Sequence, residues 1–283
     1  MSDLKIKEKT FDVKEVFKKK APVLSRFVPG FMYKYLRKII HEEEGNGILY
    51  RNRDKYGVDF VNASLDDLQA DLNIRGLENI PKTGKCILIS NHPLGGFDGL
   101  ALMKTVGKIR KDFYFLANDI LMFLPSLKPL FVPINKHGSS KDYIKTLNKA
   151  FEEDNLILIF PAGLVSRKID GKIQDLEWKN TFLSRARRNK RDIIPVYIDG
   201  KNTNRFYNIA NWRKKLGIKA NIEMFYLVDE LFKQKGKTLD IYIGKPISYK
   251  TFDKSKSGKE WIKSIRDHVY RLKDNPSKVF APD

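Results

Sequence analysis

Residues 86 to 98 read Cys-Ile-Leu-Ile-Ser-Asn-His-Pro-Leu-Gly-Gly-Phe-Asp, and this stretch decides the fold of the chain. The apolar run at its start predicts a buried parallel strand, and the residues from Asp98 onward predict a helix. The loop between them therefore places His92 and Asp98 at the carboxyl end of a strand, where open α/β sheets bind their ligands.

His92 and Asp98 have the chemistry of an acid/base dyad. A neutral imidazole can take a proton from a hydroxyl near neutral pH, and a carboxylate on its other nitrogen fixes the tautomer and stabilises the imidazolium. Extended chain would hold the two side chains apart, but Gly95 and Gly96 permit the positive φ angles that fold the loop back. A single histidine after an apolar strand is also common as a structural residue, so the spacing alone leaves both interpretations open.

Short apolar runs alternate with helical patterns from Ala70 onward. This alternation predicts an α/β fold with a mixed, largely parallel sheet covered by helices on both faces. The predicted strands span residues 72–77, 85–90, 113–117, 131–134, 156–160, 193–198 and 239–243. The predicted helices span residues 98–106, 139–153, 178–190, 204–215, 219–234 and 258–273.

The first 70 residues differ in pattern from the rest of the chain. They predict an N-terminal helical subdomain over residues 1–70, with helices at 13–20, 31–44 and 62–69, ahead of an α/β domain over residues 71–283. Their apolar faces are flanked by lysine and arginine, which is typical of helices that lie on an anionic bilayer. The alternative is a helical unit packed on the α/β core with a solvated basic face.

The charge of the chain limits its partners. Lys and Arg number 54 against 34 for Asp and Glu, and a net charge of +20 predicts a surface that attracts polyanions, either anionic membrane lipid or nucleic acid. Neither a reader helix nor a sheet face with interleaved aromatic and basic residues is evident, so a nucleic-acid partner is not expected.

The compartment is inferred from features that the sequence lacks. The single cysteine, Cys86, allows no intrachain disulfide and favours a reducing cytosol. The charged N-terminus is unlike a signal peptide, and no stretch of about 20 residues is free of charge, so no spanning helix is expected. His41, His137 and His268 lack the spacing of metal ligands, and no metal site is predicted.

The most apolar segment covers residues 116–134 and contains three prolines, which exclude a regular membrane helix. Two interpretations stay open. The segment is either ordinary core with a loop, or an acyl-chain groove or a loop that dips into the bilayer.

Asn91-His92 followed by Asp98 resembles the first signature block of the glycerolipid (lysophospholipid) acyltransferase family, whose members acylate lysophosphatidic acid and related lysolipids. The common form of the block has four residues between His and Asp, whereas this chain has five. The longer form resembles the branch that contains O-acyltransferases of bacterial amino-acid lipids and proteins often labelled hemolysins.

Three later segments resemble the remaining blocks in the required order. Residues 130–136, Leu-Phe-Val-Pro-Ile-Asn-Lys, resemble the second block, with Lys136 where the family usually has arginine. Residues 160–166, Phe-Pro-Ala-Gly-Leu-Val-Ser, resemble the third block, and residues 194–196, Ile-Pro-Val, resemble the fourth.

The resemblance implies an O-acyltransferase that moves a fatty acyl group from a thioester to the hydroxyl of a lysolipid. His92 and Asp98 would be catalytic, no cofactor would be needed, and acyl carrier protein or coenzyme A would carry the acyl group as co-substrate. With the residues next to these blocks, it leads us to expect substrate-binding residues at Asn91, Lys136, Pro161, Gly163, Ser166, Arg167 and Lys168. Among these, we expect Gly163 and its neighbours to bind the oxyanion or the acceptor headgroup, the three basic residues to bind an anionic group, and Pro161 to set the shape of the loop.

The third block departs from the family. Ala162, Leu164 and Val165 stand where the family has Glu, Thr and Arg, so Arg167 and Lys168 are the nearest replacements for the missing positive charge. The change tilts the predicted acceptor slightly from lysophosphatidic acid toward a lyso-aminolipid such as an N-acylated amino acid. We expect a peripheral enzyme on the cytoplasmic face of an anionic membrane. The alternatives are a basic nucleic-acid-binding protein and a non-catalytic membrane-associated protein.

Overall fold

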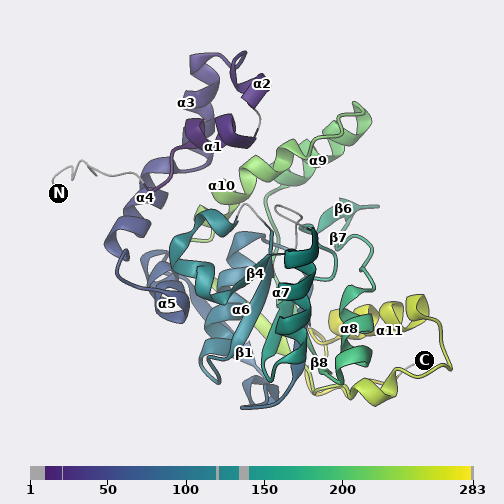
Figure 1. Cartoon of the computed structure of the whole chain (residues 1–283). Helices are drawn as coiled ribbons and strands as arrows, with labels where there is room; N and C mark the ends of the chain where they lie inside the picture. Colours follow the sequence, from purple (N-terminus) through teal and green to yellow (C-terminus); the bar gives the residue numbers. More distant parts are fainter. Residues whose placement is uncertain (1–9, 21, 119–120, 134–139, 282–283) are drawn as a thin grey trace.

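The computed structural model describes residues 10–20, 22–118, 121–133 and 140–281 (Figure 1). Seven strands form one sheet in the order β1-β9-β8-β2-β5-β3-β4, in which β8 and β9 are the antiparallel neighbours and the other pairs are parallel. The strands are β1 Asp71–Arg75, β2 Cys86–Ser90, β3 Phe113–Ala117, β4 Phe131–Pro133, β5 Leu156–Ile159, β8 Asp192–Asp199 and β9 Thr238–Ile243. The predicted mixed, largely parallel α/β sheet is confirmed.

Strand β2 is the middle strand and is buried on both faces. Cys86 and Leu88 face one core cluster together with residues of α5 and α6, while Ile87 and Ile89 face a second cluster with residues of α7, α8 and α11. A strand covered on both sides reads as an unbroken apolar run, which is how the sequence shows it. The carboxyl end of β2 therefore emerges at the centre of the sheet.

Helices cover both faces of the sheet, as Figure 1 shows. The α-helices are α1 Val13–Lys20, α2 Pro22–Ser25, α3 Gly30–Ile39, α4 Glu42–Arg51, α5 Gly57–Asp67, α6 Gly96–Gly107, α7 Ser140–Glu152, α8 Thr181–Asn189, α9 Asn204–Lys215, α10 Leu227–Phe232 and α11 Gly258–Arg271. Short 3-10 turns lie at η1 Leu77–Asn79, η2 Leu121–Phe123, η3 Pro125–Leu130, η4 Ile222–Tyr226 and η5 Tyr249–Thr251. Among the described residues no helix combines the length and the apolar character needed to cross a membrane.

The predicted strands agree with the structure to within one or two residues, but the sequence reading missed a hairpin. Strands β6, Arg167–Ile169, and β7, Lys172–Gln174, pair antiparallel outside the main sheet. Asp170 and Gly171 form the turn between them, with φ angles of 48° and 77°. Asp-Gly is a strong signal for this kind of two-residue turn, but the strands are too short to show alternation.

The N-terminal helices differ from the prediction. The predicted helix 31–44 is two helices, because His41 takes a left-handed conformation with φ 48° between α3 and α4. The predicted helix 62–69 begins earlier, at Gly57, and its Phe60 and Leu65 are buried in the same cluster as the sheet. Helix α5 thus belongs to the main core, while the predicted boundary at residue 70 stays a prediction.

The described part of the apolar segment 116–134 is largely core. After β3 the chain passes through η2 and η3 into β4, and Leu127, Leu130 and Phe131 are buried in the cluster that includes α5 and α6. Phe123 is exposed, whereas Leu121 and Leu124 are partly buried against the same cluster. The packing favours a core segment with loops, whereas the family resemblance favours the acyl-chain groove or the bilayer loop. The predicted helix 219–234 is likewise replaced by η4 and the short α10.

A buried histidine gives the fold a measurable acid sensitivity. Burial beside the positively charged Lys278 and Arg271 lowers the pKa of His268 from 6.5 to about 4. Between these two values the unfolded chain binds a proton that the folded chain does not bind, so stability falls as pH drops through this window.

We therefore expect His268→Leu to lose less thermal stability than the wild type when the pH is lowered from neutral to about 5. Melting temperatures from circular dichroism at a series of pH values measure the effect. Equal slopes for the two proteins between these pH values would contradict the assignment.

Candidate active site

The loop after β2 brings His92 and Asp98 into contact. His92 Nδ1 lies 2.9 Å from Asp98 Oδ2, although six positions separate the residues in the chain. Gly95 makes the reversal with φ 86° and ψ −126°, and α6 begins at Gly96 with ordinary helical backbone. Only the first of the two glycines therefore needs a positive φ, and Asp98 lies in the first turn of the helix.

Three donors converge on one oxygen of Asp98. Besides the ring of His92, the backbone N–H groups of Leu94 and Gly95 donate to Asp98 Oδ2 at 2.8 and 3.1 Å. This oxygen accepts hydrogen bonds from both amides, so it is also the acceptor in its contact with His92. Nδ1 of the imidazole therefore carries the proton, and Nε2 is the basic nitrogen. The same carboxylate closes the loop and orients the base.

Asp98 is fully buried, which has an electrostatic cost. Among the described residues no donor reaches its second oxygen, Oδ1. Burial raises the pKa of the Asp98 carboxyl, and the hydrogen bonds from His92, Leu94 and Gly95 oppose that rise by favouring the charged form. A carboxylate held at this depth by a histidine and two loop amides is the usual arrangement of a residue that orients a catalytic base.

The His92 ring is accessible on one side only. It stacks on Phe160, with ring centroids 3.9 Å apart and an angle of 13° between the planes, and Phe115 contacts Phe160 edge to face. The side chain keeps 15% of its surface exposed, and Nε2 makes no hydrogen bond to a described residue. Phe160, itself held by Phe115, thus fixes the plane of the imidazole, while Nε2 stays open to a reactant.

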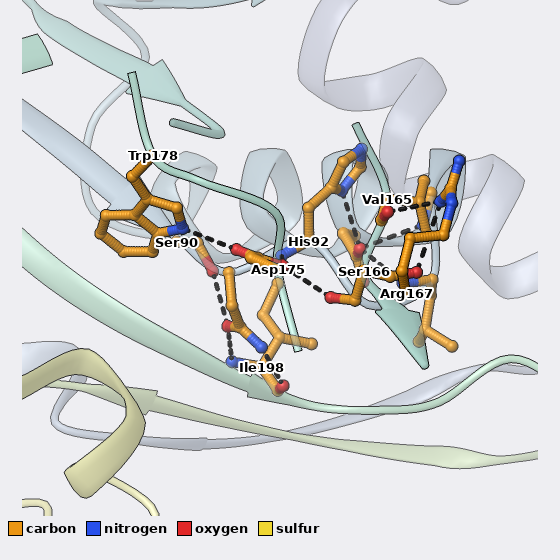
Figure 2. A network of polar contacts seen from close by, with 12 residues as sticks. Ser90, His92, Val165, Ser166, Arg167, Asp175, Trp178 and Ile198 are labelled. Atoms are coloured by element: carbon orange, nitrogen blue, oxygen red, sulfur yellow. Dashed lines mark hydrogen bonds and ion pairs between the residues drawn. The ribbon is translucent and has the colours of Figure 1, made fainter. Parts of the chain in front are cut away.

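A second aspartate holds the backbone of His92 (Figure 2). Asp175 Oδ1 accepts the N–H of His92 at 3.1 Å and the hydroxyl of Ser166 at 2.6 Å, while Oδ2 accepts the indole N–H of Trp178 at 2.9 Å. The N–H of Ser166 donates to the carbonyl oxygen of His92 at 2.7 Å. Both backbone polar groups of His92 are therefore held by residues from the segment 166–175, which follows β5.

Asn91 extends the sheet by one residue with its side chain. Its amide Nδ2 donates to the carbonyl of Ile198 at 2.9 Å, and its Oδ1 accepts the N–H of Ile198 at 2.7 Å. The side chain is buried, and both of its polar atoms are used to tie the loop to β8. Asn91 thus acts on the direction of the chain just before His92, rather than as an exposed substrate contact.

Two of the predicted substrate-binding residues are committed to the protein interior. The Ser166 hydroxyl is buried and donates to Asp175. The buried Arg167 pairs with Glu223 at 2.9 Å, and Arg213 of α9 pairs with the same carboxylate. The guanidinium of Arg167 therefore compensates Glu223, and Lys168, half-buried on β6 with no ion pair to a described residue, is the available cation of the two.

Gly163 lies in the loop between Phe160 and Ser166, both of which contact His92. It adopts φ 68°, and its own N–H donates to the carbonyl of Phe160 at 3.0 Å. A turn bond thus occupies the Gly163 amide, so an oxyanion donor from this loop must be a neighbouring N–H. Pro161 is buried, and its carbonyl accepts the Lys179 N–H at 3.0 Å, which supports its predicted role in shaping the loop.

The sequence reading missed a cation beside this loop. A methyl group built on Gly163 would lie 3.2 Å from Lys179 Nζ, so the ammonium group lies directly over the glycine. Lys179 carries no motif, and its place becomes visible only when the loop after β7 folds back onto the third block. Lys136 lies outside the described residues, and its predicted role stays a prediction.

Helix α10 packs on the loop of residues 91–95 that joins β2 to α6, which we call the catalytic loop. A methyl group on Gly95 would lie 3.2 Å from Leu227, and one on Gly96 would lie 3.3 Å from Leu231. The glycine pair is therefore needed for close packing as well as for the turn. Val165, at the position where the family has arginine, is buried with Phe206 and against Leu227. Apolar contacts replace a charge next to the dyad.

Chemically, the site offers a general base at the carboxyl end of the central strand, an aromatic wall formed by Phe160, and at least two cations near the neighbouring loop. Among the described residues no group of three or more histidine, cysteine or acidic side chains could hold a metal ion. The arrangement is suited to removing a proton from a hydroxyl that approaches Nε2. A histidine at this edge of the sheet with a carboxylate behind it is the arrangement expected of an enzyme that activates a hydroxyl.

Comparisons with known proteins give the family. An acyltransferase family profile matches residues 15–277. Two curated relatives, from Phocaeicola vulgatus and Bacteroides thetaiotaomicron, are each 46% identical over 263 residues, which is 92% of this chain and 94% and 97% of theirs. Both are named lyso-glycine lipid O-acyltransferase. The chain belongs to the acyltransferase family, and it is an acyl-transferring enzyme.

A solved structure also aligns with the chain. The 1-acyl-sn-glycerophosphate (LPA) acyltransferase PlsC from Thermotoga maritima gives a TM-score of 0.44 at 18% identity, over 88% of this chain and 95% of that one. A likeness at this level supports no statement about the substrate of the present chain.

Loss of the dyad is expected to slow turnover strongly without unfolding the protein. His92→Ala removes the base, and we expect kcat to fall by about 10²–10⁴-fold, the range that general-base catalysis supplies. Asp98→Asn is expected to cost a similar factor, because an amide in place of the carboxylate no longer fixes the Nδ1–H tautomer. Initial rates of acyl transfer, with melting temperatures as the folding control, measure both effects. Retained activity in folded His92→Ala would end this assignment.

Asp175 is predicted to be a positioning residue. Asp175→Asn keeps the size of the side chain, but its new NH₂ group donates and cannot accept a hydrogen bond. At least one of the three donors to Asp175, from His92, Ser166 and Trp178, therefore loses its acceptor. We expect kcat to fall about 10- to 100-fold with little change in KM for the acceptor, because the base is displaced while the binding surface stays.

Trp178→Phe is the matched control. It removes the indole donor from Asp175 Oδ2, while Asp175 Oδ1 still accepts the N–H of His92. Steady-state kinetics below the melting temperatures of both variants compare them. Equal kcat for Asp175→Asn and the wild type would remove the positioning role.

Proposed function

We propose that this enzyme transfers a fatty acyl group from a thioester to the hydroxyl of a lyso-glycine lipid. The observation that carries the proposal is the His92–Asp98 pair, with its free Nε2 at the carboxyl end of β2, in a chain that is 46% identical to two lyso-glycine lipid O-acyltransferases. The acceptor is taken from the relatives' names, and the geometry supports the chemistry.

The proposed reaction is a direct transfer. The acceptor hydroxyl gives its proton to His92 Nε2 as its oxygen attacks the thioester carbonyl, and Asp98 offsets the positive charge of the imidazolium. The tetrahedral intermediate then collapses, the carbon–sulfur bond breaks, and the imidazolium returns the proton to the thiolate. The products are an ester and a free thiol, and no acyl-enzyme is required.

The third block fits an acceptor without a glycerol phosphate headgroup. An N-acylated glycine carries a single carboxylate, which needs less compensating charge than a phosphate. Val165 is buried among apolar side chains, and Arg167 is paired with Glu223, so Lys168 and Lys179 are the cations left near the loop in the described part of the chain. We propose that one of these two lysines binds the carboxylate.

The donor is proposed to be a thioester of acyl carrier protein or coenzyme A, with no other cofactor. A net charge of +20 suits an acidic carrier protein as well as the phosphates of coenzyme A. The same charge suits an anionic membrane, and we propose that the enzyme acts as a peripheral protein at the cytoplasmic face.

Acylation of defined acceptors by the purified protein tests the proposal. Lyso-glycine lipid and lysophosphatidic acid, each dispersed in detergent, are offered separately with acyl carrier protein and coenzyme A thioesters, and products are read by mass spectrometry. We expect ester formation on lyso-glycine lipid, at least about tenfold faster than on lysophosphatidic acid, because one interaction of about 1.4 kcal/mol gives that ratio. Turnover of lysophosphatidic acid alone would contradict the proposed acceptor.

A further inference from the structure

The end of α9 and the turn after it carry an unusual set of exposed apolar side chains. Trp212 and Leu216, one helical turn apart, are each 68% exposed. The neighbouring Ile218, Ile222 and Phe225 are also exposed. We call these five residues the α9 patch. An exposed apolar group of this size usually marks an interaction site.

The charge around the α9 patch is positive. Lys214, Lys215 and Lys219 are exposed and form no ion pair with a described residue. Glu223, the single acidic residue between positions 204 and 226, is fully buried and paired with Arg167 and Arg213. Residues 204–226 therefore present exposed apolar side chains and lysines but no exposed carboxylate, which is complementary to an anionic lipid surface.

The N-terminal helices carry a second group of exposed apolar side chains and contact the segment that bears the α9 patch. The hydroxyls of Tyr35 on α3 and Tyr226 are 2.8 Å apart, and Arg205 of α9 donates to Tyr35 at 3.0 Å. On the same helical unit Phe27 and Phe31 are about three-quarters exposed, at 77% and 74%. Figure 1 shows α9 extending from the body on the side where α1–α3 stand.

The segment that bears the patch is also attached to the catalytic loop. From η4 the chain enters α10, whose Leu227 and Leu231 lie against Gly95 and Gly96. His41, at the start of α4, contacts Asp229 of α10 at 3.0 Å, so the N-terminal helices are tied to the same segment. The α9 patch is thus joined through one short helix, α10, to the loop that carries His92 and Asp98.

We propose that the α9 patch docks on a lipid bilayer that contains anionic lipids, with Trp212 and Leu216 inserted at the headgroup boundary and the three lysines on the headgroups. This inference rests on the proposed function, because an enzyme that acylates a lysolipid must take its acceptor from a membrane. A compact acidic carrier protein would match the lysines, but the exposed Phe27 and Phe31, on helices that contact the same segment, favour an extended lipid surface over it.

Tryptophan fluorescence of the full chain gives a direct test. The chain has three tryptophans, and Trp178 and Trp261 are buried, at 3% and 2% exposed, so a solvent-sensitive signal comes from Trp212. We expect vesicles of phosphatidylcholine and phosphatidylglycerol to shift the emission to shorter wavelength and to protect it from acrylamide. Trp212→Phe should lose the shift and still sediment with the vesicles.

Matched variants separate the apolar and the charged contributions. Trp212→Ala with Leu216→Ala should weaken vesicle co-sedimentation roughly tenfold or more, whereas Ile144→Ala with Val279→Ala, two exposed apolar residues elsewhere, should not. Changing Lys214, Lys215 and Lys219 to Glu should weaken it roughly a hundredfold, and the same change at Lys250, Lys254 and Lys259 should weaken it far less.

Three results would overturn the docking surface. One is no co-sedimentation of the wild type with the anionic vesicles. Another is co-sedimentation with Trp212 still open to acrylamide, which would assign binding to α3 alone. The third is a fluorescence shift with acyl carrier protein and none with vesicles.

The vesicle experiments contain neither acyl donor nor acceptor, so their results do not depend on turnover. Acylation of detergent-dispersed lyso-glycine lipid, measured in parallel, should be unchanged in the Trp212 and Leu216 variant. Failure of that acylation in the wild type would end the proposed function while the vesicle results still decide the docking surface.

Discussion

The convergence of three N–H donors on Asp98 Oδ2 is the interaction on which the rest of the site depends. The carboxylate closes the loop by accepting the amides of Leu94 and Gly95, and it orients the imidazole by accepting Nδ1–H. Because the group is fully buried, its charge is costly, and these donors offset part of that cost. The orientation of the base and the closure of the loop therefore depend on the same carboxylate.

The second support comes from the segment after β5. Asp175 and Ser166 hold the backbone N–H and carbonyl of His92, and Phe160 holds its ring, so that the block resembling the family's third signature acts on the block that carries the base. The adjacency of β2 and β5 in the sheet makes this possible, because parallel neighbours end at the same edge. Residues whose motif position suggests substrate contact thus act largely as the frame of the catalytic loop.

The sequence was sufficient to predict those features of the fold and the site that depend on a local pattern of residues. An apolar run predicts the strand before His92, and the glycine pair predicts the reversal at Gly95. The spacing of the carboxylate from the histidine predicts the contact between His92 and Asp98. Other features depend on long-range packing that no local pattern encodes. Asp175 lies 83 positions from His92, Lys179 meets Gly163 only after the loop folds back, and Arg167 is paired with a glutamate on η4. The break at His41 also escaped prediction, because the helical pattern continues through it.

The protonation of His92 at rest tests the central claim most directly. Nitrogen-15 NMR of histidine-labelled protein near neutral pH, with His92→Ala used to assign the signal, distinguishes the two ring nitrogens. We predict a proton on Nδ1 and an unprotonated Nε2. A neutral ring with its proton on Nε2 would mean that Asp98 does not hold the imidazole as the base for acyl transfer, and would contradict the roles assigned to both residues.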